Sequence, residues 1–255
     1  MQQPLPYLYF VLGVLLALLC FAALLYLSYR KSGKLRDMVR FVLSPREYGE
    51  LDLRTASILK SFLWFLAIHL SLTFLYHFTD VLIHAGDAAG NSVGQAARSL
   101  PLWVVLLLPP LLEETAFRLP LRRRRTYLTV AAAALIFFIS APLFSTRVYD
   151  VTWPRILSCA AVALLVWFRG YGWIRRLGFR SWFWGLVLLF ALLHVVNYEL
   201  GAMDAGEWLR VLLKEAVKIP SALMFAYIRL RHGFTLSIVL HFIVNLSAFL
   251  LGAMA

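Results

Sequence analysis

The stretch "PLWVVLLLPPLLEETAFRLPL", residues 101–121, places two adjacent glutamates and an arginine at the end of an apolar run. A run of about 20 mostly apolar residues is long enough to cross a bilayer as a helix. An ionised carboxylate is costly in hydrocarbon, so a glutamate in such a run is a candidate functional residue whose partner must be identified. This stretch therefore predicts a membrane helix that carries a candidate site.

The rest of the chain repeats the apolar pattern. Hydrophobic residues make up 62% of the 255 positions, too many for a soluble domain with a polar surface. The sequence predicts an all-α, polytopic transmembrane bundle of about eight spans, or seven if a weaker run does not cross. The candidate spans lie at roughly 6–28, 56–78, 102–121, 126–144, 156–169, 181–200, 209–229 and 234–252. The fifth is short, and the charged first half of the seventh is a candidate for an amphipathic interfacial segment.

The basic residues indicate topology. The formal net charge is +12, but the basic residues form short clusters between the apolar runs, so they do not indicate a nucleic-acid partner. The clusters lie within residues 30–54, 122–125, 169–180 and 229–232. All fall on one side of the expected membrane topology, which the positive-inside rule makes cytoplasmic. Both chain termini are therefore expected outside, in a multi-pass protein of the bacterial inner membrane.

The chain divides into two expected parts. Residues 1–99 hold the N-terminal transmembrane helices and a partly helical cytoplasmic linker at 30–55, and residues 100–252 hold the candidate catalytic membrane domain. The two cysteines, Cys20 and Cys159, lie inside apolar runs and provide neither a disulfide framework nor a cysteine-rich metal site.

The two glutamates have different expected roles. Glu114 and Arg118 are four residues apart on a helix, with the acid N-terminal to the base, which favours an ion pair. Glu113 points about 100° away from Glu114, on a face that it shares with Phe117, and is free to act as a general base. The alternative is that all three charged residues mark the cytoplasmic end of a span beside "RRRR" at 122–125.

Two prolines precede the glutamates. Pro109 and Pro110 remove two helix amide donors and crowd the carbonyls one turn earlier, so we expect the helix to be kinked or broken there. Such a kink would open a water-accessible cavity, and a simple packing bend is the alternative.

Polar residues recur at helical spacing in two later spans. In "FALLHVVNY", Phe190 and His194 are at positions i and i+4, and in "LHFIVNL" the same spacing separates His241 from Asn245. By contrast, His69 has no companion motif, and we interpret it as a hydrogen-bonded packing residue.

The ordered fragments "EETAFR", "FALLH" and "HFIVN" closely resemble the CPBP family. This family comprises the type II CAAX prenyl proteases and the bacteriocin-processing or Abi proteins, which are glutamate-dependent or metal-dependent intramembrane proteases. The resemblance covers roughly residues 100–250 and departs from the family pattern at Leu119, where a glycine is usual.

The resemblance implies a role for each matched residue. Glu113 would activate water, His194 would help to hold that water, and His241 with Asn245 would stabilise the tetrahedral oxyanion. The supporting residues would be Glu114, Arg118 and Phe190. The implied activity is an intramembrane endopeptidase that cleaves a membrane-associated, lipidated or hydrophobic peptide.

A metal-dependent route is open as well, with the cofactor undetermined. Glu113, His194 and His241 together could bind Zn²⁺ and leave a coordination position for water, as catalytic zinc sites do. The residues themselves do not choose between the two routes.

Three other functions compete with proteolysis. The strongest is a non-catalytic immunity or scaffold membrane protein of the same fold, followed by a transporter and by a lipid-modifying enzyme. No internal repeat of the kind typical of transporters is present. The expected partners are the lipid bilayer and a peptide or membrane-protein substrate.

Overall fold

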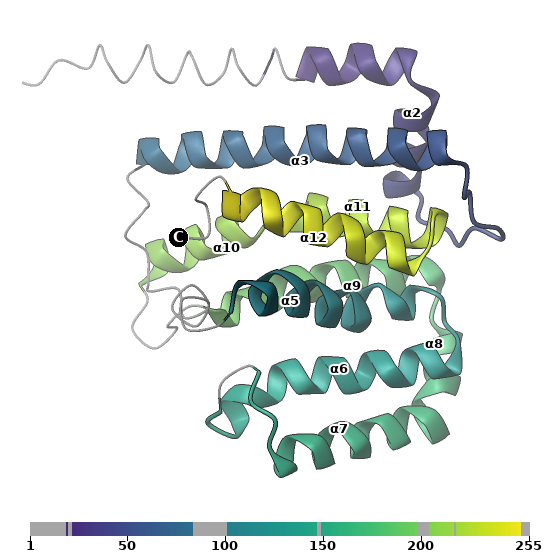
Figure 1. Cartoon of the computed structure of the whole chain (residues 1–255), viewed down its shortest axis with the longest axis vertical. Coiled ribbons are helices and arrows are strands. Elements are labelled where there is room, and N and C mark those ends of the chain that lie inside the picture. Colours follow the sequence, from purple (N-terminus) through teal and green to yellow (C-terminus); the bar gives the residue numbers. More distant parts are fainter. Residues whose placement is uncertain are drawn as a thin grey trace, which may run out of the picture.

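A computed structural model describes residue 19 and residues 22–83, 101–146, 149–197, 204–216 and 218–250. The described residues form helices and no strands, so the predicted all-α class is confirmed. After a helical stretch at 22–31, the elements are α2 (Gly33–Leu43), α3 (Thr55–Ile83), α5 (Leu102–Phe117), η2 (Leu119–Leu121), α6 (Arg125–Leu143), α7 (Trp153–Leu165), η3 (Val166–Gly170), α8 (Tyr171–Arg176), α9 (Phe179–Leu193), η4 (His194–Asn197), α10 (Ala205–Ala216), α11 (Lys218–Arg231) and α12 (Phe234–Leu250). Most of the helices lie side by side, with their connections at the two ends (Figure 1).

Two helices in the described part are long and apolar enough to cross a membrane, and eight such helices are not shown. They are Thr55–Thr73 within α3, and Trp153–Arg176, which joins α7 to α8 through the π-helical turn η3. The run that looked short at 156–169 is thus part of a 24-residue helix. The expected first span lies mostly outside the described residues, as do both termini.

The run at 209–229 contains two separate helices, α10 and α11. Every residue from Ala222 to Leu230 of α11 is buried. α11 contacts α2, α3, α9, α10, α12 and η2, which makes it the central helix of the bundle. Neighbouring helices surround this stretch of α11, so none of its residues from Ala222 to Leu230 faces solvent or lipid.

Aromatic side chains join the N-terminal helices to the rest of the core. The ring of Phe65 on α3 lies 5.0 Å from that of Phe225 on α11, measured between centroids. Phe41 on α2 makes edge contacts with Phe183 on α9 at 5.3 Å and with Tyr227 on α11 at 5.4 Å. Edge-to-face packing of this kind is favourable beyond the apolar area that it buries.

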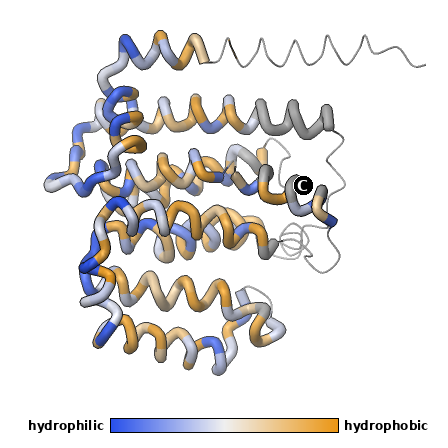
Figure 2. The backbone as a smooth tube through the Cα atoms, turned by 180° about the vertical axis from the view of Figure 1, so that it is seen from behind, coloured by the Kyte–Doolittle hydropathy of each residue, from blue (hydrophilic) through white to orange (hydrophobic). Residues whose placement is uncertain are grey.

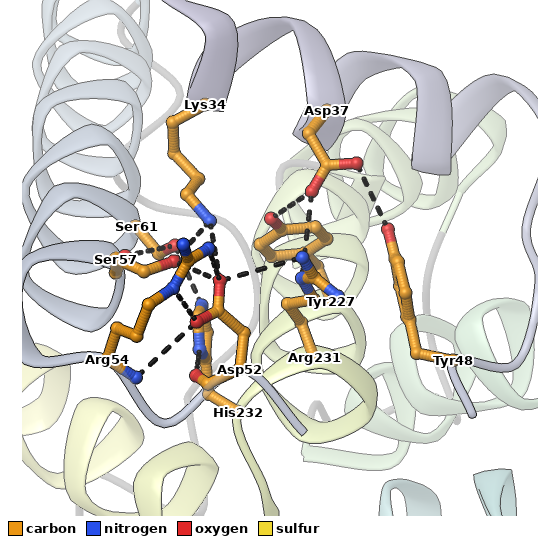
Figure 3. Close-up of polar contacts among 10 residues, drawn as sticks. All are labelled: Lys34, Asp37, Tyr48, Asp52, Arg54, Ser57, Ser61, Tyr227, Arg231 and His232. Carbon is orange, nitrogen blue, oxygen red and sulfur yellow. Dashed lines mark hydrogen bonds and ion pairs between the residues drawn. The ribbon is translucent and has the colours of Figure 1, made fainter. Parts of the chain in front are cut away.

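The expected linker at 30–55 is attached to the core through the Asp52 cluster (Figure 3). The buried carboxylate of Asp52 accepts hydrogen bonds from Arg54 Nε at 2.9 Å and from Ser57 Oγ at 2.5 Å, and Arg231 Nη2 lies 3.5 Å away. Nδ1 of His232 donates to the Asp52 carbonyl at 2.6 Å. The cluster consists of Lys34, Asp37, Tyr48, Asp52, Arg54, Ser57, Ser61, Tyr227, Arg231 and His232.

Hydrophilic residues gather at one end of the helices (Figure 2). The connection between α2 and α3, the segment between η2 and α6, helix α8 and the α11–α12 turn all lie at that end (Figure 1). These segments carry many of the basic residues of the four clusters, so these residues share one end of the bundle.

Candidate functional site

The glutamates lie in the last turn of α5, which continues unbroken through Pro109 and Pro110. A break, one of the two predicted outcomes, is therefore wrong, whereas the kink stays a prediction. A proline has a backbone φ close to the helical value, so two adjacent prolines remove two amide donors and still leave the helical path open. The helix ends at Arg118, whose backbone N–H donates to the Glu114 carbonyl at 2.9 Å.

Glu114 is wholly buried and connects two helices. Its Oε1 lies 3.5 Å from Arg118 Nε, which is the predicted ion pair, and 3.0 Å from Nδ1 of His241 on α12. Its Oε2 accepts a hydrogen bond from the hydroxyl of Ser237, also on α12. The Arg118 guanidinium lies 3.9 Å from the centre of the Phe190 ring, so Phe190 supports the ion pair through a cation–π contact.

The partners of Glu114 determine the tautomer of His241. A carboxylate that faces a guanidinium and a hydroxyl donor is ionised, so the His241 nitrogen beside it, Nδ1, carries hydrogen and donates. In the neutral imidazole the other nitrogen, Nε2, is then an acceptor. This nitrogen lies 3.7 Å from Oε2 of Glu113.

His194 reaches the same glutamate from α9. Its Nδ1 lies 2.7 Å from the Phe190 carbonyl, and since a carbonyl only accepts, Nδ1 carries the hydrogen. Its Nε2 is therefore an acceptor as well, and it lies 4.0 Å from Oε2 of Glu113. Both contacts to Glu113 are longer than a direct hydrogen bond, the separation at which a bridging water is usual.

Solvent access differs between the two glutamates. The Glu113 side chain is 18% exposed and that of His194 is 17% exposed, whereas the Glu114 side chain is 0% exposed. The open carboxylate thus belongs to the residue with no fixed cationic partner. The predicted Glu114–Arg118 ion pair is present, and the role of Glu113 as a base stays a prediction.

Asn245 is not brought into hydrogen-bond contact with these residues. It lies half-buried on α12, one turn beyond His241, and its side chain makes none of the hydrogen bonds seen in the described part of the chain. His69 is a packing residue, as predicted: Nδ1 lies 3.0 Å from Ser221 Oγ, and the ring stacks on Phe65.

Sequence reasoning missed two residues near the site. Ser237 is wholly buried, and its signal was available because it precedes His241 by four positions on α12. Tyr149 lies in the α6–α7 connection, where burial and then the charge of Glu113 raise the pKa of its hydroxyl. No helical spacing relates Tyr149 to Glu113, so the sequence contained no signal for it.

No group of three His, Cys, Asp or Glu side chains among the described residues is arranged to hold a metal ion. Glu113, His194 and His241 are all among the described residues, and they do not form such a group.

No protein-family model matches this chain, and no match was found among the curated proteins or the solved structures.

Proposed function

We propose that the protein is an intramembrane endopeptidase that hydrolyses a peptide bond in a membrane-associated, lipidated or hydrophobic peptide. One observation carries this proposal: the accessible carboxylate of Glu113 on α5 faces the bare ring nitrogens of His194 on α9 and His241 on α12. These groups, from three separate helices, combine a base with two groups that can orient a water molecule. The resemblance to CPBP proteases points in the same direction.

In the proposed reaction, Glu113 is the general base. Its carboxylate takes a proton from a water molecule, and Nε2 of His194 accepts the other hydrogen of that water and orients it. The water oxygen attacks the carbonyl carbon of the peptide bond to form a tetrahedral oxyanion. When the C–N bond breaks, Glu113 returns the proton to the leaving amine.

His241 and Asn245 are the proposed donors to the oxyanion. With Nδ1–H donated to Glu114, His241 has only Nε2 left to face the oxyanion, and it donates there when that nitrogen carries a hydrogen. The Asn245 amide donates without a change of protonation. It would have to turn toward the substrate, since it makes no hydrogen bond with the other site residues.

The membrane setting is also part of the proposal. In Thr55–Thr73 and Trp153–Arg176, 11% and 0% of the residues in the most apolar window are buried inside the protein. Such exposed apolar surface is typical of helices that face lipid. We propose a multi-pass bundle of about eight spans in a bacterial inner membrane, with its basic end in the cytoplasm and both termini outside.

A non-catalytic scaffold or immunity protein is the second candidate. The buried contacts of Glu114 with Arg118, Ser237 and His241 favour it, because such a network stabilises helix packing without any turnover.

The test compares the membrane peptides and small membrane proteins of cells that express the wild type, Glu113→Gln or Glu50→Gln at matched levels. Glu50 is exposed in the linker, and its side chain makes no hydrogen bond or ion pair with the described residues, so it controls for loss of a carboxylate. Mass spectrometry should find cleavage products with the wild type and Glu50→Gln but not with Glu113→Gln. Identical peptide profiles from the three folded proteins would reject the protease and favour the scaffold.

A further inference from the structure

Ser237 on α12 is wholly buried and reaches the candidate site through Glu114. Its hydroxyl carries one hydrogen and lies beside two acceptors, Oε2 of Glu114 and the Phe225 carbonyl, the latter 3.2 Å away. An ionised carboxylate is the stronger acceptor, so the hydrogen is donated to Glu114. Among the described residues, Ser237 is the one side chain that donates to this oxygen.

The ion pair of Glu114 with Arg118 is incomplete. Oε1 of Glu114 lies 3.5 Å from Nε of Arg118, whereas Nη1 and Nη2 of the same guanidinium are buried without a hydrogen-bond partner among the described residues. A guanidinium and a carboxylate frequently form two parallel hydrogen bonds, which are stronger than one. Two side chains of α12 oppose that geometry here, because Ser237 holds Oε2 and His241 holds Oε1 at 3.0 Å.

We propose that Ser237 is a positioning residue, which keeps the Glu114 carboxylate on Nδ1 of His241 and away from the two free nitrogens of Arg118. This role rests on the proposed hydrolysis and adds a residue to it. With Nδ1–H donated to Glu114, the imidazole presents a bare Nε2 to Glu113, whose Oε2 lies 3.7 Å away.

The bare nitrogen keeps the proposed base available. In the resting site, His241 has no hydrogen on Nε2 to donate to Glu113, so the Glu113 carboxylate can take a proton from water. The opposite tautomer would place an Nε2–H group beside Oε2 of Glu113. A hydrogen bond from that group would occupy the oxygen that the water needs.

Packing alone does not select the tautomer. The Phe225 ring stacks on the His241 ring, with centroids 4.4 Å apart and an angle of 22° between the planes. This contact fixes the plane of the imidazole, but the two neutral tautomers have the same shape and stack equally well. The acceptor at Nδ1 decides between them, and Ser237 holds that acceptor in place.

The first test reads the tautomer by nitrogen NMR and needs no substrate. Full-length protein with isotope-labelled histidine is studied in a neutral detergent, and the His241 signals are assigned by their loss in His241→Gln. The wild type should carry its hydrogen on Nδ1. In Ser237→Ala, Glu114 is free to pair with the Nη atoms of Arg118, so the Nε2–H tautomer of His241 should appear.

The matched control is Ser247→Ala, which removes another hydroxyl from α12. Ser247 is half-buried and donates to the Val244 carbonyl of its own helix at 2.7 Å. This variant should keep the wild-type tautomer of His241. A bare Nδ1 in the wild type, or the wild-type tautomer in Ser237→Ala, would overturn the proposal.

The second test measures kcat and KM for a substrate found by the peptide comparison. Ser237→Ala should lower kcat about tenfold, the effect of losing one hydrogen bond to a charged group, and should leave KM near the wild-type value. Ser247→Ala should keep both constants. Wild-type kcat in a Ser237→Ala protein with an altered tautomer would overturn the role of Ser237 and leave the protease in place. No cleavage by a wild type with the expected tautomer would instead reject the proposed function, and the catalytic role of Ser237 with it.

A further pair of variants covers the case in which Ser237→Ala does not fold. Ser237→Cys has a side chain of similar shape and a weaker donor, so it should fold and show part of the change in tautomer and kcat. Ser247→Cys is its control and should match the wild type. The wild-type tautomer and kcat in Ser237→Cys, together with a misfolded Ser237→Ala, would show a purely structural role and overturn the proposal.

Discussion

Glu113 and Glu114 are adjacent in the chain, yet tertiary contacts give them different surroundings. Glu114 is wholly enclosed by Arg118, Ser237 and His241, whereas Glu113 is partly open and faces two imidazole nitrogens beyond direct hydrogen-bond distance. The first arrangement fixes a carboxylate in place, and the second leaves a carboxylate able to exchange a proton.

This difference predicts opposite effects of two substitutions at the residue scale. Arg118→Ala leaves the Glu114 carboxylate buried without its cation, a change that costs about 3–5 kcal/mol. The yield of folded protein in detergent should fall for Arg118→Ala and remain at the wild-type level for Glu113→Gln, as measured by size-exclusion chromatography. Equal losses of folded protein would contradict the division of roles.

The metal-free mechanism makes a second prediction at this scale. Active protein should contain no stoichiometric zinc by elemental analysis and should keep its proteolytic activity after strong chelation. If chelation removed the activity and added Zn²⁺ restored it, the mechanism in which Glu113 activates water without a metal would be wrong. The metal-dependent route would then be favoured.

At the scale of elements, the α11–α12 turn positions the helix that carries His241. The turn contains Gly233 at φ +117°, a backbone conformation that other residues rarely adopt. The Asp52 cluster binds the same turn through His232 and Arg231. A linker that is distant in the sequence therefore helps to position α12.

The Asp52 cluster predicts a loss of stability in acid. Burial lowers the pKa of His232 below 6.5, so only the unfolded chain gains a proton there as the pH falls through 6.5, which destabilises the folded state. Hydrogen bonds from Arg54 and then from Ser57 lower the pKa of Asp52 below its ordinary value of 3.8. The ionised Asp52 therefore stabilises the folded state above pH 3.8, and this stabilisation is lost as the pH falls below that value. The melting temperature in detergent should thus fall between pH 7 and pH 5 and again below pH 4. In His232→Gln the first decrease should be smaller than in the wild type, and an unchanged decrease would contradict this assignment.

At the scale of the whole molecule, the basic residues gathered at one end and the exposed apolar helices predict a membrane protein with its basic end in the cytoplasm. In a background with Cys20 and Cys159 replaced by serine, an impermeant maleimide should label Val151→Cys in intact cells. It should label Arg124→Cys only after permeabilisation, because α6 (Arg125–Leu143) separates the two positions. Labelling of both positions from the same side would contradict a crossing by α6.

The sequence by itself determined the features that depend on local spacing. The all-α class follows from the apolar runs, and the Glu114–Arg118 pair follows from two residues one helical turn apart. The packing role of His69 was also predictable from its isolation. The structure excludes a break at Pro109 and Pro110, which was one of the two predicted outcomes, because the φ of proline fits a helix and α5 continues through both positions.

Only the tertiary structure decided how the helices meet. His241 lies 127 positions from Glu114, and no periodicity specifies that these side chains touch. The burial of α11 and the attachment of the linker at Asp52 depend in the same way on packing between distant segments. The physical reason is that helical spacing constrains neighbours within one turn, whereas contacts between helices depend on the side chains of every helix packed around them.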